Sequence, residues 1–230
     1  FEDFQSRQTD KFKKTVAKYF DHTLLKAFAT AEDIQALCTE AKEIGTYSVC
    51  VNPSYVSLCK TLLKDSEIKV CSVIDFPLGC SILSAKIFEC KKAIEEGADE
   101  IDYVLHIGRA KMHDWDYIRT EMEQMTKICH ENKVGIKVIL ETCYLDSSEI
   151  VQIAKIAKEV KPDFIKTSTG FGTEGATVEN VKLMVQSVEG EVNVKASGGI
   201  RDWEKCKAMI EAGATRIGVS ASMQIIKEVE

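Results

Sequence analysis

Short apolar runs alternate with longer amphipathic runs along almost the whole chain. The longer runs repeat their apolar residues every three or four positions, as Leu83, Ile87, Cys90 and Ile94 do, which predicts helices over 81–96, 113–131 and 176–188. The short runs predict strands at 19–25, 48–52, 70–76, 100–106, 136–141, 163–167, 192–197 and 216–220.

Residues at the ends of the amphipathic runs support these helix boundaries. Thr30 followed by Asp33 resembles a capping box, with aspartate in the place of the usual glutamate or glutamine. Gly45, Gly97 and Gly213 each follow the last periodic residue of a run, where a helix commonly ends on glycine. The helices are therefore expected to stop just before the strands that follow them.

The regular alternation of strand and helix predicts an α/β fold with parallel strands joined by helical crossovers. Eight such units in 230 residues fit a single (β/α)8 TIM barrel, which we assign to the whole of 1–230, with about 1–18 as a short helical extension. An open doubly wound sheet is the alternative, but no GxGxxG follows the first predicted strand.

Composition narrows the possible partners and the compartment. A formal charge of −6 argues against general nucleic-acid binding, and no run of 18 apolar residues predicts a membrane span. The N-terminal segment lacks the apolar core of a secretory signal. Nine cysteines without a CxxC pair are typical of reduced thiols, so we expect a cytoplasmic protein.

Charged residues inside the apolar strand runs are the candidate chemistry, because a buried charge is costly unless it is paired. Those nearest the predicted carboxyl ends of strands are Asp21, Asp102, Lys137, Glu141, Lys166 and Lys195. Lys137 and Glu141 lie four apart in one predicted strand, hence on one face, where neighbouring strands can pair them, and we interpret them as part of a structural salt-bridge network in the interior. Asp102, Lys166 and Lys195 adjoin glycine-rich or polar loops, and we interpret them as catalytic.

Two lysines at matching places predict amine chemistry. A free lysine has a pKa of about 10.4, and a neighbouring ammonium and partial burial both favour its neutral form. A neutral amine attacks a carbonyl to form a Schiff base, which then acts as an electron sink for breaking a carbon–carbon bond. A nearby carboxylate can move the protons that this requires. The set predicts a class I aldolase that needs no metal or other cofactor.

Glycines after the lysine-bearing strands predict a phosphate site. Gly170 follows one of them, Gly198 and Gly199 follow the next, and Ser220 lies at the end of the last strand. Backbone N–H groups in such loops bind anions, and in barrels the last loops commonly do so. We add Asp21 and Cys50 to the substrate-binding residues, because both lie near strand ends.

The histidines show no spacing typical of metal ligands. His106, His113 and His130 are not spaced to ligate a metal with one another or with a cysteine, and His22 lies beside Asp21 on the opposite strand face. We therefore predict no metal site.

Eight segments resemble the deoxyribose-phosphate aldolase family, and the resemblance runs from about residue 19 to the end. The most specific are DFIKTSTGF and VKASGGIR, and the others include DHTLLK, SVCVNPSYV, VIDFPLG, GADEIDYVLHIG, KVILETCYL and AGATRIGVSAS. The resemblance implies a (β/α)8 barrel that reversibly cleaves 2-deoxy-D-ribose 5-phosphate to D-glyceraldehyde 3-phosphate and acetaldehyde.

By position, the resemblance implies a role for each candidate. Lys166 matches the Schiff-base lysine, Lys195 the second lysine that lowers its pKa, and Asp102 the aspartate that transfers protons. The phosphate-contacting loops match at Gly170, Gly198, Gly199 and Ser220. We also expect a homodimer or a higher homo-oligomer.

Three positions depart from the family pattern: Tyr103, His106 and Ala221. The first two suggest altered surroundings for Asp102, and at Ala221 a backbone N–H would replace a serine. Two alternatives stay open. One is a different class I aldolase or a transaldolase acting on another phosphosugar. The other is a catalytically silent protein that binds a sugar phosphate, which the intact lysine–lysine–aspartate set argues against.

Overall fold

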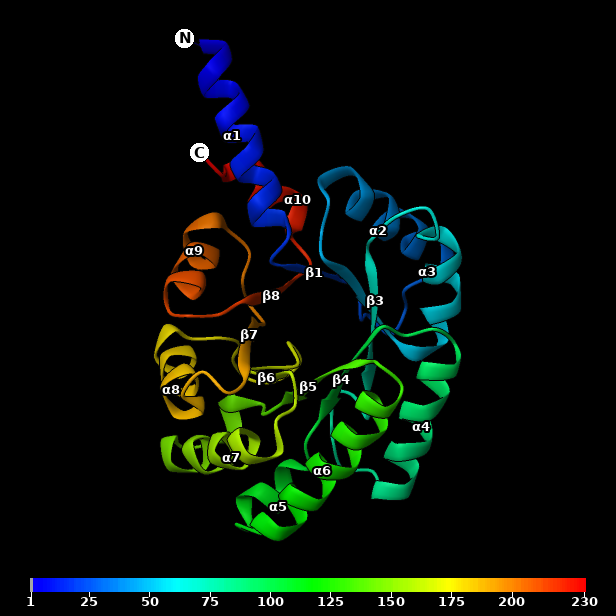
Figure 1. The fold of residues 1–230 in the computed structure, drawn as a ribbon, viewed down its shortest axis with the longest axis vertical. Coiled ribbons are helices and arrows are strands. Elements are labelled where there is room, and N and C mark those ends of the chain that lie inside the picture. The colour runs from blue at the N-terminus through cyan, green and yellow to red at the C-terminus, as the bar shows by residue number, and fades with distance from the viewer. Residues whose placement is uncertain (1) are drawn as a thin grey trace.

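Eight parallel strands close into a barrel in the computed structural model, which describes residues 2–230. Each strand pairs with the next along the chain and the first pairs with the last (Figure 1). The strands are β1 Phe20–Thr23, β2 Ser48–Val51, β3 Lys69–Ile74, β4 Glu100–Val104, β5 Gly135–Ile139, β6 Phe164–Lys166, β7 Asn193–Ser197 and β8 Arg216–Val219. The predicted (β/α)8 barrel is confirmed, and the open doubly wound sheet is wrong.

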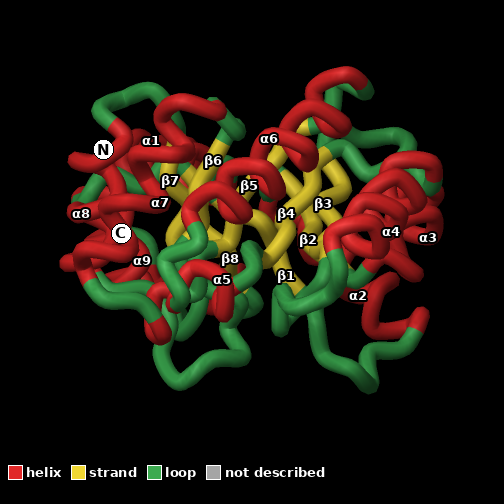
Figure 2. The backbone as a smooth tube through the Cα atoms, turned by 90° about the horizontal axis from the view of Figure 1, so that it is seen from below, coloured by secondary structure: helices red, strands yellow, loops and turns green. Residues whose placement is uncertain are grey.

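Helices surround the strands on the outside of the barrel (Figure 2). They are α1 Glu2–Ala17, α2 Ala31–Ile44, α3 Val56–Leu62, α4 Leu83–Glu95, α5 Ile107–Lys111, α6 Trp115–Glu131, α7 Ser147–Val160, α8 Val178–Val188, α9 Trp203–Glu211 and α10 Ser222–Glu228, with short 3-10 turns η1 Pro53–Tyr55 and η2 Thr142–Tyr144. The helices predicted over 81–96, 113–131 and 176–188 are α4, α6 and α8, each shifted by no more than two residues at either end.

The predicted caps of α2 are present at both ends. The hydroxyl of Thr30 accepts a hydrogen bond from the Asp33 N–H at 3.3 Å, and the Asp33 carboxylate accepts one from the Thr30 N–H at 2.8 Å. Gly45 ends the helix at φ 76°, a conformation that glycine adopts without a steric cost. These caps fix where the chain leaves β1 and where it enters β2.

Strand residues alternate between an apolar outer layer and a charged interior. In β5, Ile136 and Val138 pack in the large apolar core between strands and helices, whereas Lys137 between them points into the barrel and is fully buried. A smaller apolar cluster around Cys50 and Cys71 shares the interior. Because the side chains of a strand alternate with period two, charges that interrupt an apolar strand are brought together inside the barrel.

Helix α1 stands outside the ring and projects beside α10 (Figure 1). The ring of Phe12 meets that of Trp203 edge to face, with centroids 6.1 Å apart. Phe1, the first residue of the predicted extension, lies outside the described residues. Among residues 2–230, no helix combines the length and the apolarity that a membrane crossing needs.

Candidate active site

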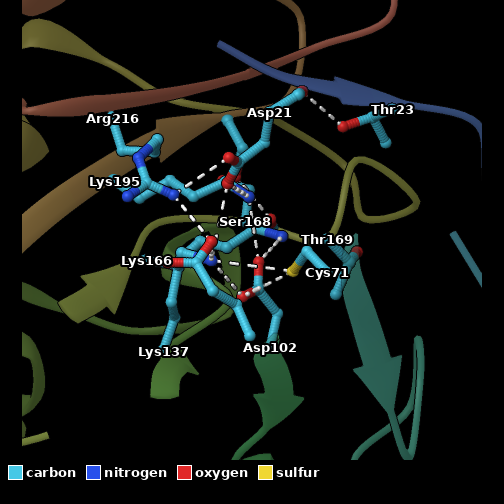
Figure 3. A network of polar contacts seen from close by, with 12 residues as sticks. Asp21, Thr23, Cys71, Asp102, Lys137, Lys166, Ser168, Thr169, Lys195 and Arg216 are labelled. Carbon is cyan, nitrogen blue, oxygen red and sulfur yellow. Dashed lines mark hydrogen bonds and ion pairs between the residues drawn. The ribbon is translucent and has the colours of Figure 1, made fainter. Parts of the chain in front are cut away.

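Charged side chains from six strands converge inside the barrel and form one network of ion pairs (Figure 3). Its members are Asp21 of β1, Glu100 and Asp102 of β4, Lys137 of β5, Lys166 of β6, Lys195 of β7 and Arg216 of β8. The network joins residues up to 195 positions apart in the sequence. Only closure of the barrel brings them together.

Asp102 is the centre of the network. Its Oδ2 accepts hydrogen bonds from Lys166 Nζ at 3.0 Å and from Lys195 Nζ at 2.9 Å. Its Oδ1 accepts one from Lys137 Nζ at 2.8 Å and contacts the thiol of Cys71 at 3.2 Å. Two amines therefore share a single carboxylate oxygen in a fully buried position.

Strand register explains this convergence. Lys166 is the last residue of β6 and is aligned with Lys195, which lies in the middle of β7. Asp102 is aligned with Lys137 on the neighbouring strand β5. Parallel strands in this register hold their inward side chains at nearly the same level, so the charges meet without long side-chain excursions.

Asp21 anchors the side of the network away from Lys166. Its Oδ2 accepts from Lys195 Nζ at 2.6 Å, and its Oδ1 accepts from Arg216 at 3.0 Å and from the Ser48 hydroxyl at 2.5 Å. Arg216 also donates to Glu100 at 2.8 Å, and its guanidinium stacks over the ring of Tyr47 at 3.7 Å. Asp21, Glu100 and Asp102 are each matched by at least one cation.

The ion pairs set the protonation states of this cluster. Burial alone would raise the pKa of Asp102, but Lys137, Lys195 and Lys166 hold that pKa well below its usual range. Burial likewise opposes the ammonium of Lys195, yet Asp102 and Asp21 raise its pKa above the ordinary value. Asp102 is therefore a carboxylate and Lys195 an ammonium at neutral pH.

A cavity of about 230 Å³ opens above the network at the carboxyl ends of the strands. Lys166 lines it, whereas Lys137 and Lys195 lie beneath its floor and are fully buried. Among the three lysines of the ion network, Lys166 is thus the one that a molecule in the cavity can reach. Catalytic groups of barrel enzymes lie at this end of the strands.

Glycine loops form one wall of the cavity. Gly170, Gly198, Gly199 and Ser220 all line it, together with Arg201. Gly198 and Gly199 have φ values of 86° and 73°, a region that other residues rarely adopt. A wall of exposed backbone beside an arginine suits an anionic group.

Comparisons with known proteins agree with this geometry. Residues 15–227 match the family model described as DeoC/LacD family aldolase. The chain is 52% identical over 214 residues to deoxyribose-phosphate aldolase of Thermococcus gammatolerans, covering 92% of this chain and 95% of that protein. The chain belongs to the DeoC/LacD aldolase family.

Solved structures agree with this family assignment. An aldolase called QR15 is 41% identical with a TM-score of 0.88, covering 93% of this chain and 95% of that one. Deoxyribose phosphate aldolase from Aeropyrum pernix, described as a unique tetramer, is 30% identical with a TM-score of 0.87, covering 96% and 94%. Membership makes this protein an aldolase, which is a carbon–carbon lyase.

Within this DeoC/LacD family aldolase, two predicted substrate contacts lie elsewhere. Asp21 and Cys50 are fully buried beneath the cavity and do not line it. Asp21 is occupied by Lys195, Arg216 and Ser48, and Cys50 packs against Leu25 and Cys71. Position near a strand end did not distinguish the residues of the cavity wall from those one layer below. Both residues support the site from below.

Of the two charges predicted to join an interior salt-bridge network, Lys137 does so and Glu141 does not. Lys137 bonds to Asp102 and Glu100, within the ion network. The strand β5 ends at Ile139, so the alternation that placed both residues on one face stops before Glu141. Glu141 instead turns toward Thr169 and accepts hydrogen bonds from its N–H and its hydroxyl.

One group of possible metal ligands occurs in the described residues: Cys50, Cys71 and Asp102. The residues around it do not suit a cation, because the side-chain nitrogens of Lys137, Lys166 and Lys195 already occupy the oxygens of Asp102. Burial raises the pKa of Cys71 well above its ordinary value, which disfavours the thiolate that binds metals. The expectation of a metal-free site stays a prediction.

The three departures from the family pattern lie outside the charged cluster. Tyr103 faces the outer core and lies under Lys86, away from Asp102. His106 caps α5 by accepting from the Arg109 N–H at 3.1 Å. Ala221 precedes the first residue of α10 and offers no side-chain cap. None of the three side chains contacts Asp102.

Sequence reasoning missed several members of the site. Arg216 and Glu100 complete the ion network, and Thr23, Phe171 and Arg201 line the cavity. The signal for Arg216 was present, since an arginine interrupts the apolar run of the last strand just as Lys195 interrupts the one before. Thr23, Phe171 and Arg201 lie within the segments DHTLLK, DFIKTSTGF and VKASGGIR, which carry the family resemblance.

Proposed function

We propose that this chain is a class I aldolase that reversibly cleaves 2-deoxy-D-ribose 5-phosphate to D-glyceraldehyde 3-phosphate and acetaldehyde. One observation carries the proposal: Lys166 reaches the cavity while sharing Asp102 Oδ2 with the buried Lys195. The substrate agrees with the names of relatives at about 50% identity, such as deoxyribose-phosphate aldolase of Thermococcus kodakarensis at 51%.

Covalent bond formation begins at Lys166. Its neutral amine adds to the C1 aldehyde of the open-chain sugar, and loss of water gives an iminium. Removal of the proton from the C3 hydroxyl allows the C2–C3 electron pair to move into the iminium, so that D-glyceraldehyde 3-phosphate leaves and an enamine remains. A proton added at C2, followed by water, releases acetaldehyde and regenerates the amine.

Asp102 is the proposed proton carrier for these steps. In the resting site its surrounding ammonium groups make it a weak base. When the iminium becomes a neutral enamine, one of those positive charges disappears beside Asp102, and its affinity for a proton rises at that moment. The carboxylate can therefore take the C3 hydroxyl proton, directly or through water, and deliver it to C2.

Lys195 is proposed to hold this arrangement together. Its ammonium bridges Asp21 and Asp102 and is raised in pKa by both, so it keeps its proton throughout. It also places a fixed positive charge beside the oxygen that Lys166 contacts. A fixed cation there disfavours a second ammonium at Lys166, which supports the amine form that attack requires.

The phosphate is proposed to bind at the wall formed by Gly170, Gly198, Gly199 and Ser220. Backbone N–H groups there would share the anion with Arg201. Binding at this end fixes the sugar, so that its other end meets Lys166 and remote binding energy is used to orient the reacting carbon.

The test is reduction with borohydride in the presence of acetaldehyde. An ethyl group should be added to the peptide that contains Lys166, as measured by mass spectrometry. Addition at Lys195, or at no lysine, would overturn the assignment. Parallel assays with deoxyribose 5-phosphate and ribose 5-phosphate separate this aldolase from one that acts on another phosphosugar. A silent binding protein would bind the sugar without being trapped.

We further propose that the protein works in the cytoplasm as a homodimer or a higher homo-oligomer. The nine free cysteines are compatible with a reducing compartment. The tetramer described for the Aeropyrum pernix relative supports self-association. Light scattering on the purified chain measures the assembly directly, and a monomer at micromolar concentration would contradict it.

A further inference from the structure

Glu141 is a buried acid that the proposed mechanism does not use. It lies just beyond β5 with only 2% of its surface exposed, and it has a φ of 57° and a ψ of 66°. A non-glycine residue in this left-handed region carries a conformational cost that neighbouring contacts must offset.

The Glu141 carboxylate accepts hydrogen bonds from the loop that follows Lys166. Its Oε1 accepts from the Thr169 N–H at 3.1 Å, and its Oε2 accepts from the Thr169 hydroxyl at 2.5 Å. The same hydroxyl accepts from the Phe171 N–H at 3.0 Å. A hydroxyl has a single proton, so this one must be donated to the carboxylate while its lone pair receives the Phe171 N–H.

This chain of hydrogen bonds spans Gly170. Thr169 and Phe171 are fixed on either side of it, and all three residues line the cavity. The loop then returns against Glu141: a Cβ on Gly172 would lie 3.2 Å from the Glu141 carboxyl carbon and 2.7 Å from Cys143 Sγ. Glu141 thus touches the loop at both ends without lining the cavity itself.

Backbone bonds extend the same junction down to the nucleophile. The N–H of Leu140 donates to the Lys166 carbonyl, and the N–H of Thr142 donates to the Thr167 carbonyl, each at 2.9 Å. The strained turn at Glu141 lies between these two bonds. Its conformation is therefore fixed relative to the loop that it supports.

We propose that Glu141 is a positioning residue for phosphate binding, acting through Thr169 to hold the backbone of Gly170 against the anion. The inference rests on the proposed function, since it assumes that Gly170 contacts the substrate phosphate. This positioning role and a direct electrostatic role predict opposite changes in phosphate affinity when Glu141 is neutralised. A carboxylate acting only through its charge would repel phosphate, so its neutralisation would tighten binding; a positioning residue predicts weaker binding.

The experiment measures inorganic phosphate by titration calorimetry, together with KM for deoxyribose 5-phosphate and borohydride trapping of acetaldehyde. Glu141→Gln cannot accept both bonds from Thr169, because its amide nitrogen is a donor. We expect phosphate Kd and KM to rise roughly tenfold, as for loss of one hydrogen bond to a charged group. Trapping of acetaldehyde, which carries no phosphate, should stay within about twofold of the parent.

Thr169 variants keep the test valid if Glu141→Gln fails to fold. Thr169→Val removes the bridging hydroxyl and should weaken phosphate binding similarly, whereas Thr169→Ser should restore it. In the Thr169→Val background, Glu141→Gln should add little, because the two act through one bond. Glu149→Gln is the matched control: this acid is also 2% exposed and caps α7. It should leave phosphate Kd unchanged.

Several results would overturn the inference. Tighter or unchanged phosphate binding in folded Glu141→Gln would do so, as would fully additive effects in the double variant. A loss of trapping as large as the loss of phosphate binding would indicate general disruption. A parent that binds inorganic phosphate but does not cleave deoxyribose 5-phosphate would reject the proposed function alone, and phosphate Kd would still decide the role of Glu141.

Discussion

At the residue scale, a few charged groups in the site each take part in several hydrogen bonds. Asp102 accepts hydrogen bonds from three lysine side chains on two oxygens, and Lys195 divides its bonds between two carboxylates. Each residue therefore has a function that its neighbours cannot take over. Substitutions at Asp102 and Lys195 should separate imine formation, proton transfer and charge.

Asp102→Asn should retain imine formation but lose turnover. The amide fills the same volume but cannot carry a proton between C3 and C2, so we expect kcat to fall roughly 10²–10⁴-fold, the usual range for a general acid–base group. Borohydride trapping with acetaldehyde should still label Lys166. A variant that is neither trapped nor active would instead assign Asp102 to imine formation.

Lys195→Leu should be slow at neutral pH and recover partly as the pH rises. Without the fixed cation of Lys195, Asp102 Oδ2 favours the ammonium form of Lys166, and the reactive neutral amine becomes scarcer. Each unit by which the pH is raised restores the neutral amine roughly tenfold. The pH–rate profile measures this directly, with Lys195→Arg as the variant that keeps the charge. A Lys195→Leu profile that is uniformly low would argue against a charge effect.

At the element scale, the periodicity of apolar residues predicted the strands and helices, whereas the ends of strands were harder to predict. Alternation in β5 identified Lys137 as an inward residue but was extended two residues too far, to Glu141. The structure of the turn depends on Thr169, which lies 28 positions later. No local pattern contains that bond. The sequence pattern likewise does not show how far below the cavity Asp21 and Cys50 lie along the barrel axis.

Contacts between adjacent loops should be sensitive to a single methyl group. A Cβ on Gly175 would lie 2.0 Å from the Gly198 carbonyl oxygen, so Gly175→Ala must displace the β7 loop that lines the cavity. Overpacking of this kind costs about 1–3 kcal/mol. If the loop absorbs it, KM for the phosphosugar should rise roughly 5- to 150-fold.

Gly45→Ala is the control for this prediction. Gly45 has a left-handed backbone conformation, at φ 76°, but a Cβ there meets no atom within 4 Å. It should lose about 1–2 kcal/mol of stability from backbone strain alone, with KM unchanged. Equal KM effects in the two variants, measured by steady-state kinetics beside thermal unfolding, would contradict a local effect on the β7 loop.

At the scale of the whole molecule, the ion network takes the place of an apolar interior. It runs from Arg216 through Asp21 and Lys195 to Lys166 beneath the cavity. The same groups that support the chemistry also join strands from opposite sides of the ring. Stability and activity therefore depend on the same bonds.

Arg216→Met should destabilise the barrel strongly. It leaves Asp21 and Glu100 with one cation fewer in a site where the arginine side chain is 6% exposed. Breaking a buried pair from one side costs about 3–5 kcal/mol. Urea unfolding measures the loss. The matched control is Arg119→Met, whose partner Glu159 is 63% exposed, and there we expect about 0–1 kcal/mol. Equal losses of unfolding free energy in the two variants would contradict a larger contribution from the buried pair.

Closure of the ring also determines how late in synthesis on the ribosome the active site can be completed. Asp21 leaves the ribosome early, but its partner Arg216 follows 195 residues later, roughly 10 to 40 s at common rates of synthesis. Throughout that interval the first strand lacks its last neighbour and the acid lacks its arginine. No growing chain has a complete active site, so amine chemistry on reactive aldehydes begins only when the molecule is finished.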